Sequence, residues 1–288
     1  MSTSDRPVEV WRLPEEDWRA GRRAATWTVG PGGELLVLLT AGAEPEPPYD
    51  ACLVTVERGG ERRLDLPQVP LRRPTYLGLL PGGRPLVVDG RAEELADGWE
   101  LNGLVFAPDG RPTRRLQLGD DVQALVTDRE GRIWLAFGDE GCYGDNPLAR
   151  RGLLGLDGAG RTVWVPDFED LPDEPMEGLA AATEGRRVWL AWYGERTFLT
   201  AADPGGGPPL SMRLPARQPV GFAIADDRAV FLQPEGELVR CVRESRKGWR
   251  EVRRERLDLP GELDRQHAHG RDGVLRFRCG NGWYRVPA

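Results

Sequence analysis

The sequence predicts an all-β protein, and three observations lead to that prediction. The stretch from Ala124 to Val165 contains two short apolar strands around a turn at Asp128–Gly131, then a third strand and a fourth. The position of Trp134 in this unit recurs at intervals of 42 to 55 residues, at Leu36, Leu86, Trp189, Phe231 and Leu275. A further strand-like segment, Val8–Leu13, precedes the first unit. Together they predict a six-bladed β-propeller of four-stranded antiparallel blades, closed by the N-terminal strand.

Each repeat has its strands in the same order. The innermost strands are expected at 25–29, 76–80, 123–127, 178–182, 221–225 and 267–270. A turn with Gly or Asp follows each of them, and the second strand then begins; Ile133–Phe137 and Val188–Trp192 are the clearest pair. Third strands are expected at 52–56, 101–107, 152–156, 197–201, 238–242 and 283–286, and outer strands at 62–66, 114–118, 161–165, 210–214 and 253–259.

The sixth repeat has no outer strand of its own, so Val8–Leu13 is expected to supply it. We therefore predict one domain over residues 1–288, with blades at about 22–67, 74–119, 122–167, 176–216, 219–260 and 264–288 plus 7–14. Only Pro14–Gly21 and Ala92–Asp97 have the composition for one or two helical turns, and both are too short to be stable alone.

Composition excludes several classes of partner. The net charge of −7 repels nucleic acid and anionic membrane surfaces. No run of 18 apolar residues exists, and the first residues do not resemble a signal peptide. The four cysteines have neither disulfide-framework nor metal-ligand spacing, which is typical of reduced thiols. We therefore expect a cytoplasmic protein, monomeric, with no nucleic-acid or membrane partner.

The segment Asp128-Arg-Glu-Gly-Arg-Ile-Trp-Leu135 resembles the blade motif Asp-x-x-Gly-x-Ile-Trp-Leu/Val of six-bladed propellers of the NHL, sensor-propeller and SMP-30 type. Its continuation, Phe137-Gly-Asp-Glu-Gly-Cys-Tyr-Gly144, is similar to an element of uncharacterised bacterial propellers. The resemblance implies the fold over nearly the whole chain. It implies little about function, because one propeller scaffold carries many functions.

The loops from second to third strands are long in the first three repeats, at Thr40–Asp50, Asp89–Gly98 and Gly138–Arg151. Length without secondary structure is typical of functional loops. All three are acidic, with Glu44, Glu46 and Asp50, then Glu93, Glu94 and Asp97, then Asp139, Glu140 and Asp145. Such loops can bind a cation, a basic peptide or a small molecule above the central channel, or they can form only a solvated rim.

The most individual segment is 138–146, which carries Asp139, Glu140, Tyr143 and Asp145. Its flanking glycines are expected to adopt positive φ and to direct the acids inward, where oxygen ligands suit Ca²⁺ or another divalent cation. The alternative is a structural turn whose acids cap backbone amides. Cys142 has no cationic neighbour in sequence that would make its thiol reactive.

Asp121, Glu177 and His267 lie near the starts of predicted inner strands and are expected to meet these acids from below. His267 and His269 face the same side of a strand, an arrangement that can bind a transition metal or can form only a hydrogen-bonded pair. The SMP-30 resemblance implies a metal-dependent hydrolase or lactonase with Glu, Asn and Asp ligands. This chain departs from that pattern, because none of its asparagines (102, 146 and 281) opens an inner strand.

Two functions therefore stay open. The first is a binding propeller that uses the acidic loop face, with Asp139, Glu140, Tyr143, Asp145, Asp121, Glu177 and His267 as ligand-binding residues. The alternative is a metal-dependent hydrolase, for which Asp139, Glu140, Glu177, His267 and His269 are the candidate ligands.

Overall fold

Antiparallel strands form almost all of the regular structure. The computed structural model describes residues 6–42, 44–202, 208–245 and 248–288. Three sheets each contain four strands: β2 (Arg22–Val29), β3 (Leu35–Ala41), β4 (Tyr49–Glu57) and β5 (Gly60–Val69); β6 (Tyr76–Leu80), β7 (Arg84–Val88), β10 (Gly103–Phe106) and β11 (Pro112–Leu116); β12 (Val122–Thr127), β13 (Ile133–Phe137), β14 (Leu153–Leu156) and β15 (Thr162–Trp164).

A larger sheet contains three further runs of four antiparallel strands. They are β16 (Glu177–Glu184), β17 (Arg187–Tyr193), β18 (Thr197–Ala202) and β19 (Leu210–Arg213); β20 (Gly221–Ala225), β21 (Arg228–Leu232), β22 (Glu237–Ser245) and β23 (Gly248–Arg256); β24 (Leu263–Arg271), β25 (Val274–Cys279), β26 (Gly282–Pro287) and β1 (Val8–Arg12). Short parallel contacts join these runs, between β16 and β24 and between β19 and β23. The predicted pairing of the N-terminal segment with the C-terminal repeat is confirmed, because β1 pairs antiparallel with β26.

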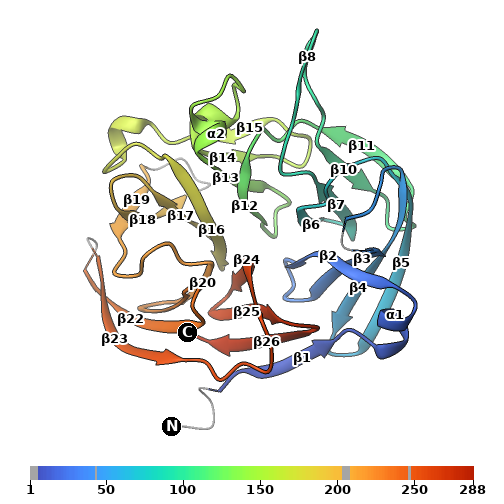
Figure 1. Ribbon diagram of the computed structural model, residues 1–288. Helices are drawn as coiled ribbons and strands as arrows, with labels where there is room; N and C mark the ends of the chain where they lie inside the picture. The colour runs from blue at the N-terminus through green and yellow to red at the C-terminus, as the bar shows by residue number, and fades with distance from the viewer. Residues whose placement is uncertain (1–5, 43, 203–207, 246–247) are drawn as a thin grey trace.

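The strand groups stand around a common centre, with the first strand of each group innermost (Figure 1). Apolar clusters fill the space between neighbouring groups. Trp134 of β13 packs in one cluster with residues of β16, β17 and β18, and Trp189 of β17 packs in another with residues of β20, β21 and β22. Both indoles are fully buried, as expected from their strand positions.

The hydrogen bonds of Asp128 explain the residues of the Asp-x-x-Gly-x-Ile-Trp segment. One carboxylate oxygen of Asp128 accepts the backbone N–H groups of Glu130 and Arg132, at 3.0 and 2.9 Å. The other oxygen accepts from Arg132 Nε at 2.7 Å and from the indole N–H of Trp134 at 2.9 Å. One buried acid thus closes the turn and fixes the tryptophan that packs between strand groups.

Two of the three long loops contain secondary structure that the sequence did not predict. Residues 94–99 form a hairpin, β8 (Glu94–Leu95) with β9 (Gly98–Trp99), so the helical turn expected at Ala92–Asp97 is wrong. This hairpin extends away from the ring (Figure 1). The loop after β13 contains the one-turn helix α2 (Asp139–Cys142) and a 3₁₀ turn at Ala149–Arg151.

The remaining helical elements are short. Helix α1 (Glu15–Arg19) occupies the segment where one or two turns were expected, and a further 3₁₀ turn spans Phe168–Asp170. Among the described residues, no helix has the length and apolar character that crossing a bilayer would require.

Candidate functional site

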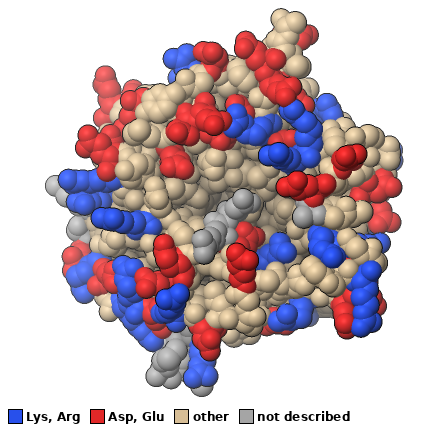
Figure 2. Space-filling model, viewed as in Figure 1, with Lys and Arg blue, Asp and Glu red and all other residues tan. Residues whose placement is uncertain are grey.

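A cavity of about 390 Å³ opens where the inner strands begin, on the face that carries α2. Polar side chains supply much of its lining, from Arg73, Thr75, Tyr76, Asp89, Arg91, Asp121, Gln123, Glu177, Gln218 and His267. The space-filling view from this side shows acidic side chains gathered around α2, next to basic ones (Figure 2). The cavity is therefore a polar hollow in the centre of a mixed but locally acidic face.

Asp121 is held rigidly at the wall of this cavity. It immediately precedes β12, adopts φ of 55°, and is 5% exposed. Its carboxylate accepts from Gln123 Nε2 at 2.7 Å and from the backbone N–H of Gly141 at 3.2 Å. A Cβ on Gly138 would lie 2.3 Å from Asp121 Oδ2, so only glycine at position 138 leaves room for that carboxylate.

Glu177, the first residue of β16, is the least constrained acid of the cavity. It is half-buried, and within the described part of the chain its carboxylate has no hydrogen-bond partner. Burial raises the pKa of Glu177, and the nearby charges of Asp139 and Asp121 raise it further. The contribution of the two acids to this shift means that negative charge lies close to Glu177, where a cation would be attracted.

His267 on β24 and Tyr76 on β6 close the deep end of the cavity. Their rings meet edge to face with centroids 5.3 Å apart, and His267 is 8% exposed. Burial lowers the pKa of the His267 imidazole, so this ring is neutral at pH 7, and its Nε2 has no partner within the described residues. His269 lies further along the same strand, with its ring 6.1 Å from that of His267.

The basic residues at the mouth are partly neutralised. Arg91 Nε donates to Asp120 Oδ1 at 2.9 Å, and its Nη1 forms an ion pair with Glu140. Asp89 accepts the backbone N–H groups of Arg73 and Arg91, each at 3.0 Å, and burial raises the pKa of Asp89. The guanidinium of Arg73 is exposed at the rim, where solvent screens its charge.

The structure brings only some of the predicted site residues together. Asp121, Glu177 and His267 line the cavity, whereas Asp139 lies close enough to Glu177 to affect its pKa but outside the lining. Glu140 pairs with Arg91, and Tyr143 and Asp145 are exposed on the surrounding surface.

The expectation of positive φ around the Asp-Glu-Gly segment is wrong. Gly138 is extended, with φ of −81° and ψ of 178°, and neither Gly141 nor Gly144 has positive φ. These glycines instead allow close packing, because a Cβ on Gly141 would lie 2.5 Å from the carbonyl oxygen of Asp120. Asp139 accepts the backbone N–H of Glu140 at 2.9 Å, as in the alternative of a turn whose acid caps backbone amides.

Sequence reasoning missed several lining residues, above all Tyr76, Gln123 and Asp89. A signal for the first two was present. Both are the first residues of predicted inner strands, the same place in the repeat that pointed to Glu177. Aligning the starts of all inner strands would have found them.

The candidate metal ligands do not form a metal centre in the described part of the chain. No three His, Cys, Asp or Glu side chains there lie close enough together to hold an ion. Each oxygen of the Asp121 carboxylate accepts one hydrogen bond, from Gln123 and from the backbone N–H of Gly141. Burial raises the pKa of the Cys142 thiol to about 12, so it is not a nucleophile at neutral pH.

Comparison with known proteins supports the fold. No protein-family model matches the chain, and no curated protein matches its sequence. A chain in the crystal structure of the mitotic checkpoint complex superimposes with a TM-score of 0.58 and 9% identity, over 96% of this chain and 80% of that one. PorZ, a surface component of the type-IX secretion system of Porphyromonas gingivalis, gives a TM-score of 0.51 and 14% identity.

The match to PorZ covers 92% of this chain but 32% of PorZ, so this chain spans about a third of that protein. At such identities structural similarity shows the fold alone. The chain therefore has a β-propeller-like, all-β fold.

Proposed function

We propose that the chain is a six-bladed β-propeller, resembling NHL and SMP-30 propellers, in which β1 completes the last blade. The proposal is supported by the four-strand groups around one centre and by the β1–β26 pairing. A ring closed in this way joins the two ends of the chain within one blade and leaves no unpaired sheet edge between them.

We propose that the central cavity binds a cationic group, either on a small molecule or on a basic side chain of a protein partner. The observation that carries the proposal is Glu177. Its carboxyl is half-buried, lacks a hydrogen-bond partner in the described residues, and has a raised pKa next to Asp121 and Asp139. An ammonium or guanidinium at this place would favour the ionised carboxylate and relieve the repulsion among the acids.

The rest of the cavity suits the same ligand. His267 is neutral because of its burial, so it adds no positive charge at the deep end. Arg91 is paired with Asp120 and Glu140, and the guanidinium of Arg73, the other arginine of the lining, is exposed at the rim. Gln123 holds Asp121 in place, so the second carboxylate is preorganised and loses little side-chain entropy on binding.

Calorimetric titration with agmatine and with a hexa-arginine peptide tests the proposal. Both probes are expected to bind wild-type protein at 50 mM salt and to bind more weakly as salt increases. Glu177→Gln should weaken agmatine by about tenfold, since it removes one charge-assisted contact. Asp121→Asn should weaken it similarly, and Asn tolerates the left-handed backbone at that position.

Asp139→Asn combined with Glu140→Gln is the comparison variant. We expect its melting temperature to be nearly unchanged. If this double variant loses binding of the peptide alone, a protein partner contacts the rim. If it binds both probes as wild type does, while Glu177→Gln and Asp121→Asn bind them more weakly, the site is restricted to the cavity. Absence of binding by either probe to wild type at 50 mM salt would refute the cation site.

A further inference from the structure

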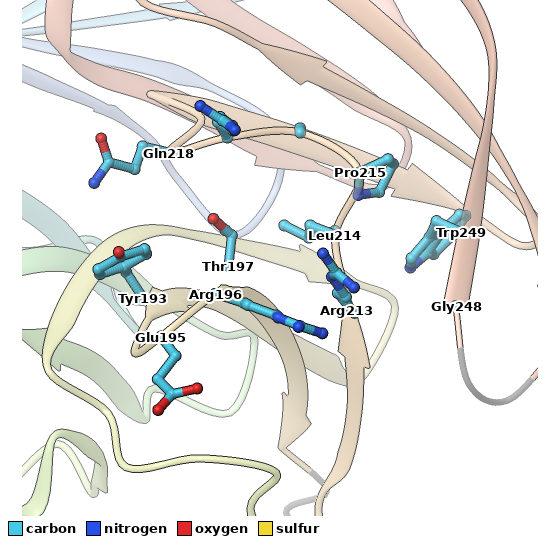
Figure 3. Close-up of a pocket in the computed structure, with 12 residues that line it drawn as sticks. Tyr193, Glu195, Arg196, Thr197, Arg213, Leu214, Pro215, Gln218, Gly248 and Trp249 are labelled. Carbon is cyan, nitrogen blue, oxygen red and sulfur yellow. The ribbon is translucent and has the colours of Figure 1, made fainter.

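A second, larger cavity lies between two strand groups and borders the central one at Gln218. It has a volume of about 790 Å³ and is lined by the β17–β18 turn, the segment that follows β19, and the start of β23 (Figure 3). The described lining includes three arginines, Arg196, Arg213 and Arg217, together with Thr197, Gln218 and Trp249. Its chemistry is thus opposite to that of the central cavity.

The three guanidinium groups have no acidic partner. Other arginines of this chain form ion pairs, as Arg63 does with Asp17 and Arg132 with Asp128. Among the described residues, no carboxylate lies within ion-pair distance of Arg196, Arg213 or Arg217, and none of the three forms a hydrogen bond through its side chain. Their positive charge is therefore not neutralised within the described protein.

The backbone fixes where these charges stand. Arg213 pairs with Phe198 on β18 and with Gly248 on β23, at the point where two strand groups meet. Arg196 belongs to a tight turn in which the backbone N–H of Gly194 donates to the Arg196 carbonyl at 3.0 Å. Figure 3 shows the side chain of Arg196 extending across the cavity toward the strand that carries Arg213. An anion at this place would be attracted by both guanidinium groups.

The wall behind Arg213 adds to this positive character. Trp249 is 7% exposed and its indole N–H has no partner in the described residues; Figure 3 shows its nitrogen on the side of the ring toward Arg213. The guanidinium of Arg243 stands over the same ring, 4.9 Å from its centroid, and its Nε and Nη2 are also unpartnered. The one acid of the lining, Glu195, directs its carboxylate away from the two arginines (Figure 3).

We propose that this cavity binds an oxyanion, a phosphate or carboxylate group, held by Arg196 and Arg213, with Arg217 as a further cation of the lining. Guanidinium groups bind such oxygens through paired, charge-assisted hydrogen bonds. The volume accommodates a small phosphorylated or polycarboxylic metabolite, and an acidic peptide side chain presents the same chemistry. Gln218 lines both cavities, but Arg196 and Arg213 line only this one, so the anion site does not rest on the function proposed for the central cavity.

Titration with pyrophosphate, citrate and a hexaglutamate peptide tests this site. We expect at least one of them to bind wild-type protein at 150 mM salt and to raise its melting temperature. Arg196→Gln with Arg213→Gln should weaken that probe by about tenfold or more for each guanidinium removed. Binding of pyrophosphate or citrate identifies a small anion as the ligand, and binding of hexaglutamate alone identifies an acidic protein segment.

Arg115→Gln with Arg228→Gln is the matched control. Both residues are exposed, lie outside the cavity and form no side-chain hydrogen bond or ion pair with other described residues, and the double variant changes the net charge by the same amount. It should bind the probe as wild type does. Equal weakening in both double variants would show a non-specific charge effect, and no binding of any probe to wild type would show that the cavity is no anion site.

Discussion

At the scale of single residues, the tryptophans buried between strand groups are expected to make large contributions to the free energy of unfolding. Trp134 and Trp189 are fully buried, and each indole N–H donates to an acid of its own hairpin, Asp128 at 2.9 Å and Glu184 at 3.1 Å. Trp134→Ala or Trp189→Ala is expected to lower the free energy of unfolding by about 3–5 kcal/mol in a urea titration.

Trp18 is the control for these variants, because it lies on α1 and is 42% exposed. Trp18→Ala should cost about 1 kcal/mol or less. A loss of that size for Trp134→Ala as well would mean that the packing between strand groups is not what holds the ring together.

A second prediction at this scale concerns His269. Its ring lies 4.6 Å from that of Trp27, and burial lowers its pKa to about 3, with the neighbouring His267 acting in the same direction. The unfolded chain has a pKa near 6.5, so between pH 6.5 and 3 it binds a proton that the native protein does not. Stability is therefore complete above pH 6.5 and falls as the pH falls toward 3.

His269→Gln removes the imidazole that binds this proton in the unfolded chain. Between pH 7 and pH 4.5 wild-type protein should lose about 2–3 kcal/mol more unfolding free energy than the variant, since each pH unit below 6.5 costs about 1.4 kcal/mol. Urea titrations at the two pH values measure the difference, and the titration of acidic residues common to both proteins cancels. Parallel pH profiles would show that His269 can be protonated in the folded protein.

At the scale of elements, the β8–β9 hairpin is an addition to the fold and not part of its core. Leu95 on β8 is 50% exposed, and β8 and β9 pair only with each other. The backbone N–H of Glu100 donates to the carbonyl of Glu93 at 2.9 Å, so the hairpin leaves and rejoins the ring at one point.

Replacing residues 94–99 with Asn-Gly should consequently leave the melting temperature within about 2 °C of wild type, because a two-residue turn can join these ends. Thermal melting followed by circular dichroism measures this. A large decrease or a broadened transition would show that the hairpin supports the ring. If the variant is stable, it also becomes a probe for partners that bind the projecting segment.

At the scale of the whole molecule, the contact between the two ends of the chain determines cooperativity. Strand β1 covers β26, and the Trp11 ring lies 4.9 Å from that of Trp283. Deleting residues 1–14 exposes the edge of β26 and this apolar contact, so the melting temperature should fall and the transition should broaden. Deletion of residues 1–6 keeps β1 and serves as the control. Identical melting of both truncated proteins would contradict closure by β1.

The sequence by itself determined the strands of the six repeats and their order, but not the β8–β9 hairpin. Local patterns carry that information: the turn at Asp128–Gly131 is closed by a side chain a few residues from its partners, and alternating apolar residues define each strand. The buried places of Trp134 and Trp189 followed from the same repeat. Even the N-terminal pairing could be predicted, because one repeat lacked an outer strand and one segment lacked a repeat.

Only the tertiary structure decided which polar groups meet. Asp121 and Glu177 were identified from their positions at inner strands, but the pairing of Glu140 with Arg91 joins segments 49 residues apart. The cavity lined by Arg196, Arg213 and Arg217 brings together the β17–β18 turn and β23. A local sequence pattern does not show whether an arginine has an acidic partner. Side-chain charges interact through space, whereas sequence periodicity records only which face of a strand is buried. The arrangement of the strands could therefore be predicted from the sequence. The two candidate sites could be identified only once the positions of neighbouring strand groups were known.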